Sequence, residues 1–484
     1  MMRRHWEQLA VIALLAFALA VRAKAADGWV FAGSDSYGYV KLAEELRLHD
    51  RYALAPAPAP LHFGRLPLYP LFIRAVKGEA PAEMSGGEGW NRIKRAQRWL
   101  DVLIALPLLY LIARRLGRSR AAGLIALALG AICPFTMLYT GAALSESLAA
   151  TLCVAAMAPL VLGGARPRVW FTVAGALLGL ATLTRPDDVF LAVAFVPALL
   201  ALKTPARIWR ERAIIAALAL AGFAVVYSPW PLRNLHQFGH AYPVGSRVDR
   251  FGNPTPNPEG WWNWCKTWGP DTWNQASLST CFYDPPCSPN FGAHTEAFDS
   301  PQERATVDTL LARRGREGLS AGVSDGFQKL TDERIRRHPL RTVLWMTAQR
   351  WWNMWVAAHD EVLQTVKVPL APVIRPLRRA FVPISGVLFV AILVSGIALS
   401  IDRRTRWLAL ILFAPLLFRT LAMAYMLFSM PRYTVEVMPF GFALVAVAAV
   451  ELGRRIRARI ATAPATSDQA TRPKPAAGSP DREV

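Results

Sequence analysis

The amino-acid sequence contains about ten long apolar segments, separated by short basic stretches and by two long polar ones. Crossing the hydrocarbon core of a bilayer takes about 20 mostly apolar helical residues, and lipid offers no partner to an unpaired backbone group. We therefore predict an all-α polytopic membrane protein with juxtamembrane helices outside the membrane and a partly irregular late outer loop. The predicted spans are residues 9–21, 99–116, 121–139, 144–162, 169–183, 189–202, 213–227, 382–400, 407–426 and 433–452.

The charged residues favour a membrane surface over nucleic acid as the partner of this chain. The formal net charge is +21, yet only 18% of the 484 residues are charged and 53% are hydrophobic. The basic residues lie in short clusters between the apolar segments, and no fingerprint of a nucleic-acid-binding module is present. We therefore predict the lipid bilayer as a partner and no nucleic acid.

The short basic loops also predict the orientation of the chain. Under the positive-inside rule, Arg and Lys concentrate in cytoplasmic loops, which places both termini in the cytoplasm and both long loops outside a bacterial inner membrane. The predicted regions are an anchor helix (1–26), a first outer loop with juxtamembrane helices (27–98), a transmembrane bundle (99–230), a second outer loop (231–381), C-terminal spans (382–452) and a basic, then disordered tail (453–484).

Short predicted spans leave two alternatives open. Residues 9–21 follow two arginines and are similar to a cleavable signal, but we favour a retained anchor because the next loop needs a tethered start. Residues 169–202 form either two short spans or a re-entrant hairpin, which meet at the charged sequence TRPDD of residues 184–188. Polar backbone at membrane depth requires surrounding protein or a water-filled cavity, so we expect a cavity at this turn.

Three of the five cysteines lie in the second long loop, which is predicted to face an oxidising compartment. One disulfide fits there, and the spacing is equally compatible with Cys281–Cys287 and with Cys265–Cys281. The loop lacks a paired CxxC motif or a set of histidine partners, so we predict no metal site.

The first outer loop carries an acid directly beyond the first span, in the sequence GSDSYGY of residues 33–39. Apolar residues then recur every three positions up to residue 48, which predicts a short amphipathic helix on the membrane surface. Asp35 stands at the expected N-cap, where accepting a backbone amide hydrogen bond stabilises a helix by about 1 kcal/mol. Helix capping and a chemical role are therefore competing interpretations of Asp35.

Other charged residues stand at predicted outer ends of the spans. Glu146 is either a first-turn residue favoured by the helix dipole or a substrate contact. Asp187 shares a turn with a nearby arginine, so an internal salt bridge and substrate contact are both open. The arginines suited to binding a phosphate group at this surface are Arg65, Arg185, Arg233 and Arg432.

Two charged residues are predicted at membrane depth near the end of the chain. Glu436 follows Arg432 by four residues, so an i,i+4 ion pair is expected, with lipid-headgroup contact by the arginine as the alternative. Arg419 lies inside the ninth span and needs a partner within the protein, for which Glu436 is the candidate.

Five local motifs give the chain its resemblance to a known group of enzymes. They are Asp35 with Tyr37 and Tyr39, the RLPLYP sequence from Arg65 through Tyr69 to Pro70, the SES sequence around Glu146, the LTRP sequence around Arg185, and Arg233-Asn234 after a PWP sequence. In this order and placement they resemble the GT-C glycosyltransferases. The similarity is to the branch that includes protein O-mannosyltransferases, lipid A aminoarabinose transferases and Rgt-type lipopolysaccharide sugar transferases.

The resemblance implies an inverting transfer of a sugar from a polyprenyl-phosphate donor to an envelope glycan, lipid or protein acceptor. It assigns Asp35 as the catalytic base. The motifs imply substrate binding by Arg65, Tyr69, Glu146, Arg185 and Arg233. Asp187 and Arg432 are added to this set because of their predicted place at the outer surface. Many relatives carry a second acid beside the first, whereas Ser36 follows Asp35 here, which argues against a two-carboxylate or metal-assisted mechanism. No cofactor is predicted, and the need for a divalent metal stays open.

Two other function classes fit parts of the pattern. A transporter or flippase would also have about ten spans, but it more often shows paired broken helices and shorter outer loops. A lipid-linked glycan polymerase or ligase would use similar phosphate-binding arginines. It would be expected to carry catalytic arginine and histidine in a late outer loop, whereas the candidate acid here follows the first span.

Overall fold

The structure of the chain is a computed structural model. It describes residues 2–26, 34–59, 61–62, 64–81, 87–202, 208–241, 259–269, 278, 281–282, 289, 291–292, 294–359, 371–426 and 429–462. Within these ranges the regular secondary structure is helical, and Ala53 forms an isolated β-bridge with Leu61. The predicted all-α fold is confirmed for this part of the chain.

The first segment of the chain is a long helix that packs into the bundle. Its buried Arg22 donates hydrogen bonds to the carbonyls of Gly130 (2.9 Å) and Ala131 (3.0 Å), and it pairs with Asp101 at 2.6 Å. These bonds fix the end of the helix against the rest of the bundle. The N-terminal elements are α1 (Met2–Ala26), α2 (Ser34–Leu48), α3 (Leu68–Lys77), α4 (Glu88–Leu100), the π-helical turn η1 (Asp101–Ala105) and α5 (Leu106–Gly117).

Prolines set the bends of the next helices. Pro134 begins a new helix because the residue before a proline avoids the helical region, and the two helices around it meet at 58°. A bend of 47° occurs in the same way before Pro229. The middle elements are α6 (Arg120–Ile132), α7 (Pro134–Thr140), α8 (Glu146–Leu162), α9 (Pro167–Thr184), the 3-10 helix η2 (Pro186–Ala194), α10 (Phe195–Ala201), α11 (Ile208–Tyr227) and α12 (Pro229–Phe238).

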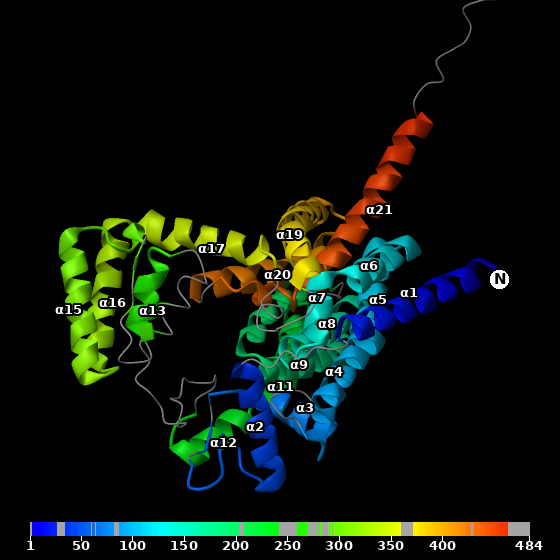
Figure 1. Cartoon of the computed structure of the whole chain (residues 1–484). Helices are drawn as coiled ribbons and strands as arrows, with labels where there is room; N and C mark the ends of the chain where they lie inside the picture. Colours follow the sequence, from blue (N-terminus) through cyan, green and yellow to red (C-terminus); the bar gives the residue numbers. More distant parts are fainter. Residues whose placement is uncertain are drawn as a thin grey trace, which may run out of the picture.

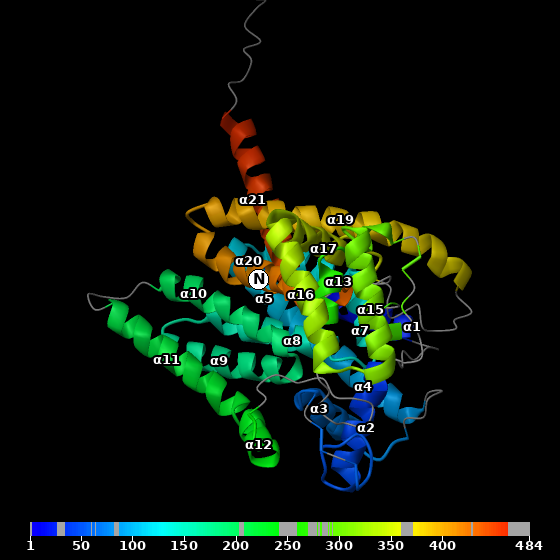
Figure 2. The same ribbon diagram turned by 90° about the vertical axis from the view of Figure 1, so that its left-hand side faces the viewer.

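Helices α9 and α11 pack with their backbones in close approach, and Figure 2 shows them running side by side. A Cβ atom at Gly175 would lie 2.0 Å from the carbonyl oxygen of Ala219, and one at Gly222 would lie 2.3 Å from that of Thr172. Small residues at such crossings allow helices in lipid to gain van der Waals contact. The two glycines therefore set the spacing of this helix pair.

The late outer loop contains a helical subdomain set apart from the bundle (Figure 1). It consists of α13 (Glu259–Lys266), α15 (Pro301–Glu317) and α16 (Ala321–Arg337), with the short 3-10 helix η3 (Thr295–Ala297). Trp261 and Trp264 are fully buried in its aromatic core. The buried ion pair of Arg334 with Glu303, at 2.6 Å, joins α16 to α15. The sequence predicts that the outer loop is partly irregular, and within its described residues these helices are regular and pack around a core that the tryptophans fill.

The C-terminal elements return from this subdomain to the bundle. Figure 1 shows α17 bridging the two, while the N-terminal end of α1 and the far end of α21 both lie on the side away from the subdomain. These elements are the π-helical turn η4 (Leu340–Trp345), α17 (Met346–Trp355), α19 (Ala371–Ile401), α20 (Arg406–Met426), the 3-10 helix η5 (Pro431–Thr434) and α21 (Met438–Thr462).

Four helices in the described residues are long and apolar enough to cross a membrane, and two bent pairs would raise the number to six. The four are His5–Ala25, Pro167–Thr184, Arg379–Ile401 and Arg406–Met426. The prediction of about ten spans is therefore not reproduced. Residues 189–202 explain part of the difference, because they form most of a 3-10 helix followed by the seven-residue α10.

Candidate functional site

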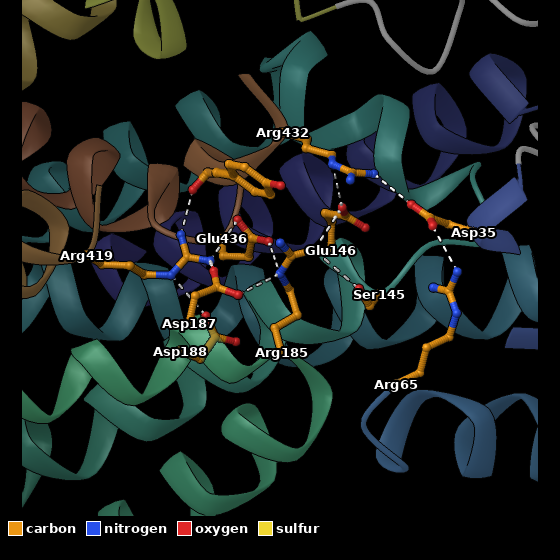
Figure 3. A network of polar contacts seen from close by, with 11 residues as sticks. Asp35, Arg65, Ser145, Glu146, Arg185, Asp187, Asp188, Arg419, Arg432 and Glu436 are labelled. Atoms are coloured by element: carbon orange, nitrogen blue, oxygen red, sulfur yellow. Dashed lines mark hydrogen bonds and ion pairs between the residues drawn. The ribbon is translucent and has the colours of Figure 1, made fainter. Parts of the chain in front are cut away.

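A polar cavity of about 280 Å³ lies where the first outer loop meets α8, the turn after α9, and η5. This is the turn at which the sequence predicts a cavity. Six of the residues predicted for the site line it, and Figure 3 shows their side chains converging from these separate elements. They are Asp35, Arg65, Glu146, Arg185, Asp187 and Arg432.

Asp35 lies between two arginines at one edge of this cavity. Helix α2 already begins at Ser34, so Asp35 occupies the first turn rather than the expected N-cap position. Its Oδ1 accepts from Arg65 Nη2 at 3.0 Å, and its Oδ2 accepts from Arg432 Nη1 at 3.1 Å. Burial by itself raises the pKa of Asp35, but the charges of Arg432 and Arg65 outweigh it and lower the pKa from 3.8 to about 2.

Arg65 is held over α2 by an aromatic side chain and a glycine. Its guanidinium lies 4.6 Å from the ring centre of Tyr39, a cation–π distance. A Cβ atom at Gly38 would lie 2.9 Å from Arg65 Nε, so a larger residue there would force this arginine to shift. Tyr69 does not line the cavity, but its ring packs edge-on against Tyr39 at 4.8 Å. Its hydroxyl donates to Gln97 at 2.7 Å, which anchors this support on α4.

Glu146 joins the two deeper arginines of the cavity. It is the first residue of α8 and almost fully buried. Its Oε1 accepts from Arg185 Nη1 at 2.9 Å and lies 3.8 Å from Arg432 Nε. Both arginines also lie near the ring of Tyr433, at 5.4 Å and 5.6 Å from its centre. The guanidiniums are thus aligned along one wall of the cavity.

The expected pairing of Arg432 with Glu436 is wrong. Arg432 turns towards Asp35 and Glu146, while Glu436 faces inward and lies 3.0 Å from Arg185 Nε. The reason is that Arg432 lies in the 3-10 helix η5 and Glu436 in the turn after it, so no continuous α-helix places the two residues one turn apart.

Behind the cavity, a buried ion network connects three elements. Arg419 on α20 pairs with Asp187, with Asp188 at 3.1 Å and with Glu436 at 3.4 Å. The expected contact between Arg419 and Glu436 is therefore present. Arg185 lies 3.5 Å from Asp187, which continues the network into the cavity wall. Because a buried charge is tolerated only with partners, this network fixes the turn after α9 against α20 and the start of α21.

Arg233 lies outside the cavity. It donates to the carbonyl of His62 at 2.9 Å, and its guanidinium lies 5.1 to 5.6 Å from the ring centres of Tyr52, Trp230 and Phe238. These contacts tie α12 to the first outer loop. A substrate-binding role for Arg233 stays a prediction that this placement does not favour.

Three further cavity residues were not singled out as site residues from the sequence. Tyr39 and Tyr433 supply aromatic rings beside the arginines, and Ser145 Oγ accepts from Arg185 at 3.4 Å. Tyr39 and Ser145 belong to motifs found in the sequence, and Tyr433 directly follows Arg432. These three residues could therefore have been predicted from the sequence as aromatic or hydroxyl residues that lie close to a charged site residue.

The described residues contain no group of three or more His, Cys, Asp and Glu side chains arranged to hold a metal ion. The cavity carboxylates instead pair with arginines. In the outer loop, Cys281 is disulfide-bonded and Cys265 is a buried free thiol. This excludes the Cys265–Cys281 pairing, and Cys287 lies outside the described residues.

Comparison with known proteins gives one family match and several matches of fold. A sequence profile of the dolichyl-phosphate-mannose-protein mannosyltransferases matches residues 95–231, which include Glu146, Arg185 and Asp187. Comparison with curated protein sequences found no match.

Among solved structures, the archaeal oligosaccharyltransferase AglB from Archaeoglobus fulgidus, in complex with an inhibitory peptide and a dolichol-phosphate, matches at 14% identity with a TM-score of 0.50. The match covers 95% of this chain and 52% of that chain. The apo form of the Archaeoglobus fulgidus oligosaccharyltransferase matches at 15% identity with the same TM-score and coverage. ArnT from Cupriavidus metallidurans bound to undecaprenyl phosphate matches at 16% identity, over 92% of this chain and 78% of that chain, with a TM-score of 0.36.

The chain thus spans about half the length of the oligosaccharyltransferase structures it matches. At these identities the likeness is one of fold. The predicted resemblance to the GT-C glycosyltransferases is confirmed by the family match and by the fold shared with AglB. The chain shares the fold of AglB, and its long apolar helices indicate an integral membrane protein.

Proposed function

We propose that this chain transfers a sugar from a polyprenyl-phosphate donor to a hydroxyl of an envelope glycan, lipid or protein. The observation that carries the proposal is the convergence of Arg65, Arg185 and Arg432 with the carboxylate of Asp35 in one cavity. A guanidinium fork matches a phosphate group in shape and charge. The AglB structure with the same fold is in complex with a dolichol-phosphate, which supports a donor of this class.

The proposed reaction is a single displacement. The acceptor hydroxyl oxygen forms a bond to the anomeric carbon as the bond from that carbon to the phosphate oxygen breaks, which inverts the anomeric centre. Asp35 takes the proton of the hydroxyl as general base. The leaving phosphate gains negative charge on its lipid carrier, and the three arginines stabilise that charge.

The ion pairs of Asp35 suggest how donor binding prepares this base. With both oxygens occupied by guanidiniums and a pKa of about 2, the carboxylate is a weak proton acceptor before substrate binds. A donor phosphate competes for Arg65 and Arg432 and draws them away from Asp35. The released carboxylate is then more basic and free to meet the acceptor hydroxyl. Donor and base would thus be coupled through shared arginines.

Glu146 and Asp187 take supporting roles in this proposal. Glu146 pairs with Arg185 and Arg432 of the cavity wall. Asp187 pairs with Arg185 of the wall and with Arg419 behind it. The late-loop histidine expected of a polymerase or ligase has no counterpart among the described residues of the cavity wall. A sugar transferase therefore accounts for more of the site than a polymerase, a ligase or a flippase.

The substitution Asp35→Asn tests the proposal. Sugar transfer from a panel of polyprenyl-phosphate sugars should fall by about 10²- to 10⁴-fold in kcat, the contribution of a general base. Binding of undecaprenyl phosphate should tighten several-fold, because the amide no longer competes for Arg65 and Arg432. Transfer is measured by mass spectrometry of the product, and binding is measured by titration of the purified protein.

Glu44→Gln is the matched control, because Glu44 is an ion-paired acid on the same helix that pairs with Lys77 and Arg47 outside the cavity. It should leave both transfer and carrier binding unchanged. Full transfer by folded Asp35→Asn protein would overturn the role of Asp35 as base. Unchanged affinity of that variant for undecaprenyl phosphate would overturn the competition between the phosphate and Asp35 for Arg65 and Arg432. It would leave the role of Asp35 as base intact.

A further inference from the structure

A second polar cavity lies at the end of the bundle away from the proposed active site. Its volume is about 550 Å³, and it is formed by the turn between α5 and α6, the turn between α19 and α20, and the later part of α21. Helix α21 connects the two cavities. From Met438 to Arg454 it rises about 24 Å at 1.5 Å per residue, which approaches the thickness of a bilayer core. The two cavities therefore lie near opposite membrane surfaces.

Arginines from all three segments meet in this cavity. Arg454 donates to the carbonyls of Gly117 (3.1 Å) and Arg118 (3.3 Å), which joins α21 to the first turn. Arg455 pairs with Asp402 at 2.7 Å, which joins α21 to the second turn. The only other acid that lines the cavity in the described part of the chain is Glu451, and it pairs with Arg454. The carboxylates are thus engaged with arginines of α21.

Two more arginines line the cavity, and their side chains make no hydrogen bond or ion pair that holds the described part of the fold together. The structure shows no hydrogen-bond or ion-pair partner for the side chain of Arg118 or Arg404 within the residues it describes, and both are exposed. Arg118 ends α5 with a φ of 44°, a left-handed conformation for which glycine is the usual residue. The positive-inside rule asks only that arginines lie on this side of the membrane. It does not require them to converge.

Exposed apolar residues are the sequence neighbours of residues that line the cavity. Ile401 is 68% exposed, Leu452 is 60% exposed and Ile456 is 49% exposed, although each lies within or at the end of a predominantly apolar helix. Leu452 and Ile456 stand one position beyond Glu451 and Arg455 on α21, so the apolar stripe adjoins the charged one. This combination of free guanidiniums and neighbouring apolar surface matches the chemistry of a phospholipid.

We propose that this cavity binds the phosphate group of an anionic membrane lipid. Arg118 and Arg404 donate to the phosphate oxygens, and the acyl chains lie along Ile401, Leu452 and Ile456. Basic pockets between helices on the cytoplasmic side of a membrane are suited to such headgroups. A bound lipid would bridge the two turns and so stabilise the folded bundle, independently of the sugar-transfer site.

The test uses the full-length protein, purified and delipidated in a nonionic detergent, with thermal unfolding as the readout. Phosphatidylglycerol should raise the melting temperature by roughly 2–5 °C, whereas phosphatidylcholine and inorganic phosphate should not. The double substitution Arg118→Ala with Arg404→Ala should abolish this rise. The control, Arg115→Ala with Arg403→Ala, removes the same charge at exposed residues that lie close to Arg118 and Arg404 in sequence but do not line the cavity, and it should keep the rise.

If both double variants lost the rise in melting temperature equally, the proposal would be overturned. The effect of phosphatidylglycerol would then depend on the total positive charge of this surface and not on the cavity. An equal rise with phosphatidylcholine would overturn it too. A rise in melting temperature with inorganic phosphate but not with phosphatidylglycerol would show that the site binds free phosphate and not a lipid headgroup. If the double variant folds poorly, native mass spectrometry of Arg404→Gln provides the second test, and an unchanged number of bound phosphatidylglycerol molecules would contradict the site.

Discussion

At the scale of single residues, the ionisation of Asp35 depends on groups that lie far away in the chain. Burial alone would raise the pKa of this carboxyl, and only the charges of Arg432 and Arg65 bring it down to about 2. The arginines themselves are aimed by neighbours that make no contact with a substrate phosphate in the proposed mechanism, such as Gly38 and Tyr69. A substitution at one of these arginines should therefore change the acid–base behaviour of Asp35.

Replacement of Arg65 by alanine tests this dependence. It removes one opposite charge, so the pKa of Asp35 should rise by about 1–3 units. If Asp35 is the base, the acid limb of kcat/KM should move to higher pH by the same amount, since the base is active when deprotonated. The measurement is the profile of kcat/KM between pH 3 and 9, together with the wild type.

Arg74→Ala serves as the control for this profile, because Arg74 is exposed and makes only a 3.9 Å contact with Asp50. Its profile should match that of the wild type. An Arg65→Ala protein with a lower rate but an unmoved acid limb would mean that Arg65 acts on the donor phosphate without setting the pKa of the base.

At the scale of elements, the close packing of α9 with α11 positions the turn that bears Arg185 and Asp187. That turn directly follows α9, so a shift of this helix would displace the arginine from Glu146. The packing depends on glycines that leave no space for a side chain. Helix spacing and site geometry are therefore linked through the backbone.

The substitution Gly175→Ala separates helix propensity from packing. Alanine favours a helix over glycine by about 1 kcal/mol, which would stabilise an isolated helix. Here the new Cβ atom would lie 2.0 Å from the carbonyl oxygen of Ala219, so we expect a lower melting temperature and weaker sugar transfer. Gly164→Ala is the control, because a Cβ atom there meets nothing within 4 Å. A melting temperature that rises in Gly175→Ala would contradict the packing.

At the scale of the whole molecule, each of the two polar cavities is proposed to act at a different surface of the membrane. The sugar-transfer site is proposed for the outer surface and the lipid-phosphate site for the inner one. Basic short loops predict this orientation, and the subdomain with its aromatic core stands on the side away from the far end of α21 (Figure 1). The assignment of inside and outside can be tested directly.

Cysteine labelling in intact cells tests the orientation. A membrane-impermeant maleimide should label Glu88→Cys without permeabilisation, whereas Arg403→Cys should react only after it. Both positions are exposed, and Glu88 makes only surface ion pairs, which contribute little stability. The parent chain without an added cysteine is the control for background labelling, and its free thiols among the described residues are buried. The reverse labelling pattern would invert the proposed topology.

Local sequence determined the helical class of this protein, the bends at Pro134 and Pro229, and the charged motifs from which the site is built. These depend on hydrophobicity, backbone restriction and residue type, which are properties of short stretches of chain. The sequence could also name six side chains of the cavity. Five of them lie near the predicted outer ends of apolar segments, and the sixth, Arg65, belongs to the RLPLYP motif of the first outer loop. It misplaced the partner of Arg432, since the local pattern did not show that a 3-10 helix and a turn, rather than an α-helix, join Arg432 to Glu436.

Only the tertiary structure decided which charges meet. Asp35 and Arg432 are 397 residues apart, and Asp187 and Arg419 are 232 residues apart, so no local pattern links them. The burial of tryptophans in the outer subdomain, the separation of Arg233 from the cavity and the convergence of Arg118 with Arg404 likewise depend on packing. The physical reason is that ion pairing and burial act over distances in space, whereas the sequence specifies only the order in which the partners are joined.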